Sequence, residues 1–161
     1  MKPIQHVSQT PATQWLAREG IGYTEHVYDY VEHGGTAASA RALGVAEHEV
    51  VKTLVLQDER NQPLIVLMHG DRQVSTKNLA RAIRKSVEPC RPEVAQRHSG
   101  YQVGGTSPFG LRKPMLLYVE ASVLELPRVL VNGGRRGYLL GIAPTIFTER
   151  LGATPVHCAL P

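Results

Sequence analysis

The chain has 161 residues, of which 42% are apolar and 20% charged, with a formal net charge of +4. These values are typical of one soluble globular domain that needs no metal or disulfide staples, and no apolar run approaches the length of a membrane span. The two cysteines lie outside any Cys-x-x-Cys pair, which excludes a disulfide framework and favours a reducing cytoplasm. We therefore predict a single domain over residues 1–161 of a cytoplasmic protein, with residues 1–9 as a loose N-terminal tail.

Cap residues, glycines, prolines and β-rich runs mark the expected elements. Thr10, Thr36 and Ser75 are each expected to cap a helix. In chain order the elements are a helix over 11–19, a strand over 21–30, a helix over 37–43, a hairpin of strands 50–57 and 64–68, helices over 76–85 and 92–98, strands over 115–119, 129–131 and 138–142, a helix over 144–151 and an edge strand over 155–159. This order predicts an α+β fold with a mainly antiparallel, barrel-like mixed sheet flanked by short helices.

The stretch over 99–114 is too rich in glycine and proline to form a helix or a regular strand, so it is a shaped loop. Gly104 and Gly105 permit close approach of a ligand to the main chain, and unpaired N–H groups in such a loop can bind anions. Arg112 and Lys113 add positive charge beside it. Two interpretations stay open, a binding loop and an ordinary tight connection.

A second glycine-rich stretch runs over 132–137 and contains Arg135 and Arg136. Guanidinium groups at such a turn suit contacts with phosphate. The alternative is a solvated hairpin tip, because Asn-Gly-Gly is a good turn in its own right.

Lys52 lies in an apolar run, and strand alternation places it on one face with Val50, Leu54 and Leu56. If that face is buried, the lysine needs an anionic ligand, a paired carboxylate or a depressed pKa. If the opposite face is the core, Lys52 points to water. A strand covered on both faces gives the same pattern, so the alternation alone does not decide.

Other reactive side chains give weaker signals. The seven histidines show no pairing at helical ligand spacing, so we expect no metal site. Ser107 is not in a nucleophile elbow and is interpreted as a loop hydrogen-bonding residue. Arg91 could activate Cys90, but a chemically idle cysteine is the preferred interpretation.

Together these stretches resemble the YbaK family, the free-standing relatives of the editing domain inserted in bacterial prolyl-tRNA synthetase. The order and spacing agree across nearly the whole chain. The matching segments are 51–54 (Val-Lys-Thr-Leu), 100–110 (Gly-Tyr-Gln-Val-Gly-Gly-Thr-Ser-Pro-Phe-Gly), 131–137 (Val-Asn-Gly-Gly-Arg-Arg-Gly) and 142–144 (Ile-Ala-Pro).

The resemblance implies an aminoacyl-tRNA deacylase that cleaves the ester of a mischarged tRNA, with no cofactor. The implied substrate is Cys-tRNA(Pro) or a related small amino acid on tRNA(Pro), and prolyl-tRNA synthetase is an implied partner, with no membrane or DNA partner. Segment 34–38 and Asn132 depart from relatives, which implies an altered wall of the amino-acid pocket. The implied site residues are Lys52, Gly104 and Gly105 for catalysis; Tyr28, Thr53, Thr106, Ser107, Pro108, Asn132, Gly133 and Gly134 for substrate binding; and Arg112, Lys113, Arg135 and Arg136 for tRNA phosphates.

An aminoacyl ester is already activated, so its hydrolysis needs mainly positioning and charge stabilisation. We expect Lys52 to anchor the terminal phosphate or the developing oxyanion, and the N–H groups of Gly104 and Gly105 to hold the carbonyl or ribose. The attacking group would be the ribose 2′-hydroxyl, a water or a substrate thiol. The rival hypotheses are a catalytically silent tRNA-binding module or synthetase partner, and a small-molecule binder.

Overall fold

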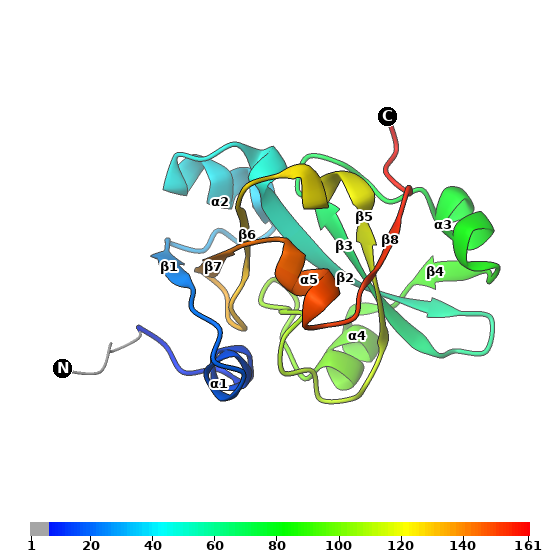
Figure 1. Cartoon of the computed structure of the whole chain (residues 1–161), viewed down its shortest axis with the longest axis horizontal. Coiled ribbons are helices and arrows are strands. Elements are labelled where there is room, and N and C mark those ends of the chain that lie inside the picture. The colour runs from blue at the N-terminus through cyan, green and yellow to red at the C-terminus, as the bar shows by residue number, and fades with distance from the viewer. Residues whose placement is uncertain (1–6) are drawn as a thin grey trace.

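A mixed sheet of eight strands forms the centre of the protein in this computed structural model, which describes residues 7–161 (Figure 1). The strands are β1 (Thr24–Val27), β2 (Val50–Asp58), β3 (Pro63–His69), β4 (Val87–Pro89), β5 (Leu116–Glu120), β6 (Val129–Asn132), β7 (Tyr138–Ile142) and β8 (Thr154–Val156). The helices are α1 (Pro11–Arg18), α2 (Gly35–Leu43), α3 (Thr76–Ile83), α4 (Pro92–Ser99) and α5 (Thr145–Glu149), with short 3-10 turns η1 (Glu47–Glu49) and η2 (Ala121–Glu125).

The strand order is β1-β7-β6-β2-β3-β5-β8, with β4 paired to β2 outside this path. Four pairings are antiparallel, namely β1 with β7, β6 with β7, and β2 with both β3 and β4. Three are parallel, namely β2 with β6, β3 with β5, and β5 with β8. The expected α+β fold with a mixed sheet and short helices is confirmed.

Both faces of the sheet are covered, and β2 contributes to each. Val51 and Val55 belong to the main core, which also holds residues of α1 and α5. Val50 packs on the opposite face under α2, and Leu56 packs on that face under α3. Lys52 shares this second face and is half-buried. Of the alternatives that the sequence left open, β2 is therefore the strand covered on both faces.

Several local predictions are confirmed. Thr10 forms a capping box at α1, and Ser75 accepts a hydrogen bond from the N–H of Asn78 at the start of α3. The expected hairpin of β2 and β3 is present as an antiparallel pair. Cap chemistry and turns act over a few residues, which is why sequence patterns detect them.

Other local predictions need correction. Thr36 does not cap α2, which begins at Gly35, two residues before the expected start, with Gly34 as its N-cap. The strand expected over 21–30 is limited to β1, and β4 was not predicted. Of the expected N-terminal tail, residues 1–6 lie outside the described structure. Residues 7 and 8 make contacts, since the N–H of Val7 donates to Glu25 at 2.8 Å.

None of the helices in the described part of the chain is long and apolar enough to cross a membrane.

Candidate active site

The middle of β2 lacks a neighbouring strand on one side. β3 pairs with β2 along residues 51–57, whereas on the other side β6 pairs only at Val50 and Val51, and β4 pairs only from Leu56 onward. Residues 52–55 therefore face no strand on that side within the part of the chain that the structure describes. We call these four residues the open segment of β2.

A pocket of about 620 Å³ lies against this open segment, and residues from both faces of β2 line it. Its volume falls within the range of small-molecule sites. The pocket therefore exists where the sheet divides between β6 and β4. Of the residues expected in the site, it brings together Lys52, Tyr28, Thr53, Gly104, Thr106 and Asn132.

Lys52 lines this pocket, and its ammonium group donates to the carbonyl oxygen of Gly70 at 3.4 Å. Burial lowers the pKa of Lys52 from its ordinary value, while the carboxylates of Glu47 and Asp71 oppose that change. A partly desolvated ammonium interacts more strongly with a developing negative charge than one in bulk water.

The Gly70 carbonyl is held in turn by neighbouring groups. The Thr36 hydroxyl lies 3.1 Å from this oxygen and 2.7 Å from the Glu47 carboxylate. A side chain at position 70 would meet the Thr36 hydroxyl oxygen at 2.6 Å, so only glycine fits there. Thr36 thus has a role that its predicted capping function did not suggest: it supports the partner of Lys52.

The two glycine-rich stretches pack directly against each other. The Asn132 side-chain amide donates to the Gly104 carbonyl at 3.1 Å, and Gly104 adopts a φ of 89°. A Cβ at Gly105 would lie 3.0 Å from the backbone of Arg135. These glycines therefore permit close contact between two backbones, and this contact shapes one wall of the pocket.

Three glycines expected in the site use their N–H groups inside the loops. The N–H of Gly105 donates to Gln102 at 2.8 Å, that of Gly133 to Tyr138 at 2.9 Å, and that of Gly134 to the Asn132 side chain at 2.6 Å. The expectation that the Gly105 N–H binds substrate is corrected on this ground, because that donor closes its own turn.

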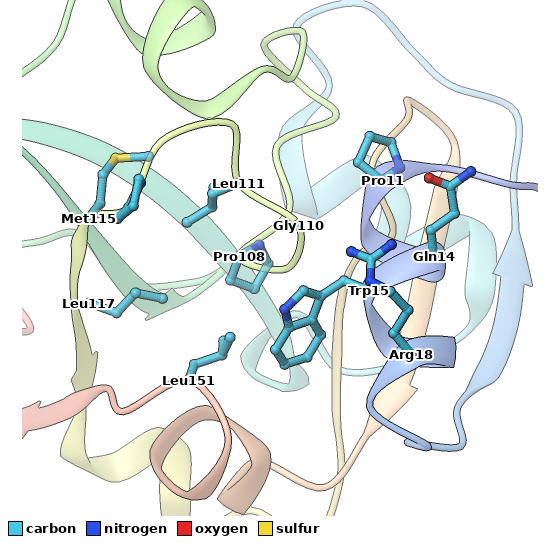
Figure 2. Close-up of a pocket in the computed structure, with 11 residues that line it drawn as sticks. Pro11, Gln14, Trp15, Arg18, Pro108, Gly110, Leu111, Met115, Leu117 and Leu151 are labelled. Atoms are coloured by element: carbon cyan, nitrogen blue, oxygen red, sulfur yellow. The ribbon is translucent and has the colours of Figure 1, made fainter.

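Ser107 and Pro108 do not line the pocket. Ser107 is fully buried, and its hydroxyl accepts from the N–H of Phe109 at 3.3 Å. Pro108 lines a separate hollow of about 340 Å³ between α1 and the loop, next to Trp15 and Leu111 (Figure 2). Both residues shape the loop that carries Gly104 and Thr106.

The four side chains expected to contact phosphates differ in their exposure and in their partners within the protein. Arg112 and Lys113 are exposed, although the Lys113 ammonium lies 3.2 Å from His98 Nδ1. Arg136 donates to the Val103 carbonyl at 2.9 Å, with its guanidinium 4.9 Å above the ring of Tyr30. Arg135 donates to Ser8 and lies over the buried ring of Tyr138. None of the four lines the pocket.

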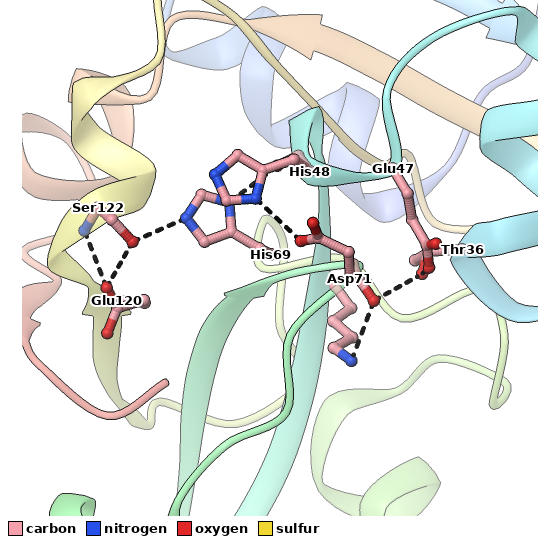
Figure 3. A network of polar contacts seen from close by, with 9 residues as sticks. Thr36, Glu47, His48, His69, Asp71, Glu120 and Ser122 are labelled. Atoms are coloured by element: carbon pink, nitrogen blue, oxygen red, sulfur yellow. Dashed lines mark hydrogen bonds and ion pairs between the residues drawn. The ribbon is translucent and has the colours of Figure 1, made fainter. Parts of the chain in front are cut away.

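The structure also gathers His48, His69 and Asp71 at the ends of η1 and β3, with one potential ligand atom from each within 4.8 Å of the others (Figure 3). The two imidazole rings stack at 3.7 Å with an angle of 9° between them, so their in-plane lone pairs run parallel and do not converge on one point. Both nitrogens of His69 already have partners, the His48 carbonyl and the Ser122 hydroxyl at 2.8 Å each. The cluster therefore supports the turn at residues 70–71, where Asp71 contacts His48 at 2.9 Å.

The profile of the family described as aminoacyl-tRNA editing domain matches residues 32–148, well over half of the chain. The chain belongs to this family. The matched residues include Lys52, both glycine-rich stretches and most of the pocket, which confirms the resemblance drawn from the motifs.

Individual proteins are similar to this chain as well. The chain is 27% identical over 138 residues to EbsC of Enterococcus faecalis, which carries the provisional name Cys-tRNA(Pro)/Cys-tRNA(Cys) deacylase, with 84% of each chain covered. It is 34% identical over 105 residues to proline–tRNA ligase of Thermodesulfovibrio yellowstonii, covering 65% of this chain and 18% of that enzyme.

Solved structures agree on the fold. The hypothetical protein APE2540 superposes with a TM-score of 0.86 at 26% identity, covering 93% of this chain and 99% of its own. A protein provisionally described as a trans-editing enzyme for prolyl-tRNA synthetase superposes with a TM-score of 0.84 at 21% identity, covering 94% and 96% of the two chains.

Some pocket residues were not predicted from the sequence. Thr36 and Ser39 of α2 line the pocket, and segment 34–38 was noted only as a departure from relatives. Cys90 lines the pocket too, but burial raises the pKa of its thiol, which supports the interpretation of an idle cysteine. Their membership of the site depends on how distant segments meet, for which a local pattern gives no signal.

Proposed function

We propose that this protein is a trans-editing deacylase that hydrolyses the ester of a mischarged aminoacyl-tRNA. The observation that carries the proposal is the meeting of Lys52, Gly104 and Asn132 in one pocket. Membership of the editing-domain family supports the reaction class. The chemistry agrees with it, since hydrolysis of an ester at a tRNA 3′ end needs a pocket with a positive charge and few further groups.

Lys52 acts as an electrostatic anchor for the oxyanion that develops when the ester carbonyl is attacked, or for the terminal phosphate. Its ammonium is poised by the Gly70 carbonyl and remains close to two carboxylates that favour the charged form. The attacking group is a water, the ribose 2′-hydroxyl or a substrate thiol. Gly104 and Thr106 place the terminal adenosine at the pocket mouth.

The substrate we propose is a small amino acid such as cysteine on tRNA(Pro). The provisional name of EbsC and the match to proline–tRNA ligases support this choice. The wall formed by Gly35, Thr36 and Ser39 carries two hydroxyl groups that donate within the protein, so their oxygens can accept a hydrogen bond from a small polar side chain.

The experiment that tests the function is deacylation of a panel of mischarged tRNAs by the wild type and by Lys52→Ala and Lys52→Met. Methionine retains the apolar stem and removes the charge. We expect the rate on the preferred substrate to fall by about 10²- to 10³-fold in both variants, as for loss of one group that stabilises an oxyanion.

Lys85→Met is the matched control, because Lys85 pairs with Asp58 at 3.8 Å away from the pocket. It should leave the rate unchanged. Wild-type rates in both Lys52 variants would refute the catalytic role of this lysine. Salt-sensitive tRNA binding without turnover of any charged tRNA would instead identify a silent binding module.

A further inference from the structure

The backbone of the open segment of β2 presents polar groups to the pocket. The carbonyl of Val50 accepts from Gly70 at 2.6 Å on the β3 side, whereas the carbonyl of Val55 accepts from the N–H of Cys90 at 3.1 Å on the opposite side. In a strand the N–H and C=O of one residue point to the same edge, and successive residues alternate. The N–H and C=O of Thr53 and the N–H of Val55 therefore point into the division between β6 and β4.

These groups face no strand in the described part of the chain, since β6 pairs only as far as Val51 and β4 begins at Leu56. The Thr53 hydroxyl, which projects from the face of the strand and not from its edge, is buried without a hydrogen-bond partner among the described residues. Backbone groups at a strand edge with no strand beside them are available to pair with an extended ligand, so the N–H and C=O of Thr53 and the N–H of Val55 mark a place where a ligand can bind.

The gap between the two pairing partners offers backbone hydrogen-bonding groups to one residue of extended chain. A strand rises by roughly 13 Å from Val51, the last residue paired with β6, to Val55, whose carbonyl pairs with Cys90, and only the N–H and C=O of Thr53 and the N–H of Val55 face the gap between these contacts. An aminoacyl ester carries one N–H donor and one carbonyl acceptor in the same relative positions as a strand residue. It can therefore pair with a sheet edge as a peptide does in β-strand addition.

We propose that the aminoacyl group of the substrate binds as a one-residue strand in this gap, its α-amino group donating to the Thr53 carbonyl. The ester carbonyl accepts from the N–H of Thr53 or from the N–H of Val55. These two donors lie on either side of the Thr53 carbonyl along the strand edge. The inference rests on the proposed function and extends it: the site selects α-amino acyl esters over α-hydroxy acyl esters, through the backbone and not through the amino-acid side chain.

This placement also gives the position of the Lys52 side chain relative to the bound ester. Adjacent strand residues project side chains to opposite faces, so a ligand held at the edge by Thr53 has the Lys52 side chain on one face of its carbonyl. The ammonium can then approach the ester oxygen from outside the plane of the sheet.

The test uses the full-length protein and two non-hydrolysable analogues, 3′-alanylamino-3′-deoxyadenosine and its lactyl counterpart, in which a hydroxyl replaces the α-amino group. Amide hydrogen exchange is followed by NMR. We expect the alanyl analogue to slow exchange at Thr53 or Val55 by about tenfold or more at saturation. The Leu54 amide faces β3 and should be unchanged. The lactyl analogue should bind about 5- to 10-fold more weakly, because its neutral hydroxyl makes a weaker hydrogen bond to the Thr53 carbonyl than a charged ammonium does.

Thr53→Val separates backbone from side chain, because it keeps the shape and the peptide group while removing the hydroxyl. It should preserve the discrimination between the two analogues, and loss of that discrimination would overturn the backbone assignment. Equal affinities for the two analogues, binding without change at either amide, or no binding at millimolar concentration would also overturn it. These outcomes are distinct from failure of the proposed function, which would appear as intact binding of the alanyl analogue without deacylation of any tRNA.

Discussion

The ammonium group of Lys52 lies where an apolar face of β2 meets the polar turn at Gly70. Its stem lies on the same face as Val50 and Leu54, which pack in two small apolar clusters, while its ammonium reaches the Gly70 carbonyl. A long side chain can bury its stem and keep a charged end among polar groups in this way. The two nearby carboxylates, of Glu47 and Asp71, oppose the lowering of the Lys52 pKa by burial.

Removing either carboxylate should lower the pKa of Lys52 further. A negative charge favours the ammonium form, so Glu47→Gln or Asp71→Asn leaves desolvation less opposed, and the lysine loses its proton at a lower pH than in the wild type. We expect NMR titration of the Lys52 Cε resonance to show this downward shift. The alkaline decline of deacylation, corrected for spontaneous ester hydrolysis, should move to lower pH with it.

Glu49→Gln is the control for this titration, because Glu49 also belongs to η1 but is not among the charges that act on Lys52. An unchanged midpoint in both Glu47→Gln and Asp71→Asn would show that these carboxylates do not sustain the charge.

At the scale of elements, the start of α1 is tied to the site. The Thr10 hydroxyl accepts from the N–H of Thr13 at 3.1 Å as a helix cap and also donates to the Gly133 carbonyl at 2.5 Å. A Cβ at Gly134 would meet Thr10 at 2.9 Å, so helix and turn are closely packed. The first helix thus holds the second glycine-rich stretch against the first.

Thr10→Ala should therefore lower the free energy of unfolding by more than the loss of a helix cap alone. Ser75→Ala removes the cap of α3 and is expected to lower the free energy of unfolding by about 1 kcal/mol. Thr10→Ala additionally leaves the Gly133 carbonyl without its donor, which adds about 1–3 kcal/mol. Urea denaturation of the two variants measures the difference, and equal losses would show that the contact with Gly133 contributes nothing.

At the scale of the whole molecule, the net charge of +4 and the exposed cations Arg112 and Lys113 bear on tRNA binding. Binding to phosphates releases counterions, so affinity falls with salt in proportion to the number of contacts. The double variant Arg112→Gln, Lys113→Gln should weaken binding of tRNA(Pro) and reduce the slope of log K against log salt by roughly one to two.

Arg60→Gln serves as the control of this measurement, since Arg60 lies in the turn between β2 and β3 and is not among the expected phosphate contacts. Its salt slope should match that of the wild type. If the double variant also keeps the wild-type slope, the tRNA backbone does not pass over these two residues.

Local chemistry was sufficient for part of the structure. Thr10 and Ser75 predict the starts of helices because a cap involves residues three positions apart. The hairpin of β2 and β3 is predicted by two β-rich runs around a short turn. The motifs around Lys52 and Gly104 were likewise sufficient to indicate the family, since their order along the chain is itself the signal.

The site itself was decided only by the tertiary structure. The division of the sheet at residues 52–55 depends on β6 and β4 pairing with different parts of β2, and those partners lie far away in the chain. Alternation could not tell which face of β2 covers Lys52, because it reports the period of a strand and not its neighbours. Hydrogen bonds between distant segments create the pocket, and the residues that take part in them carry no mark of it in their local sequence.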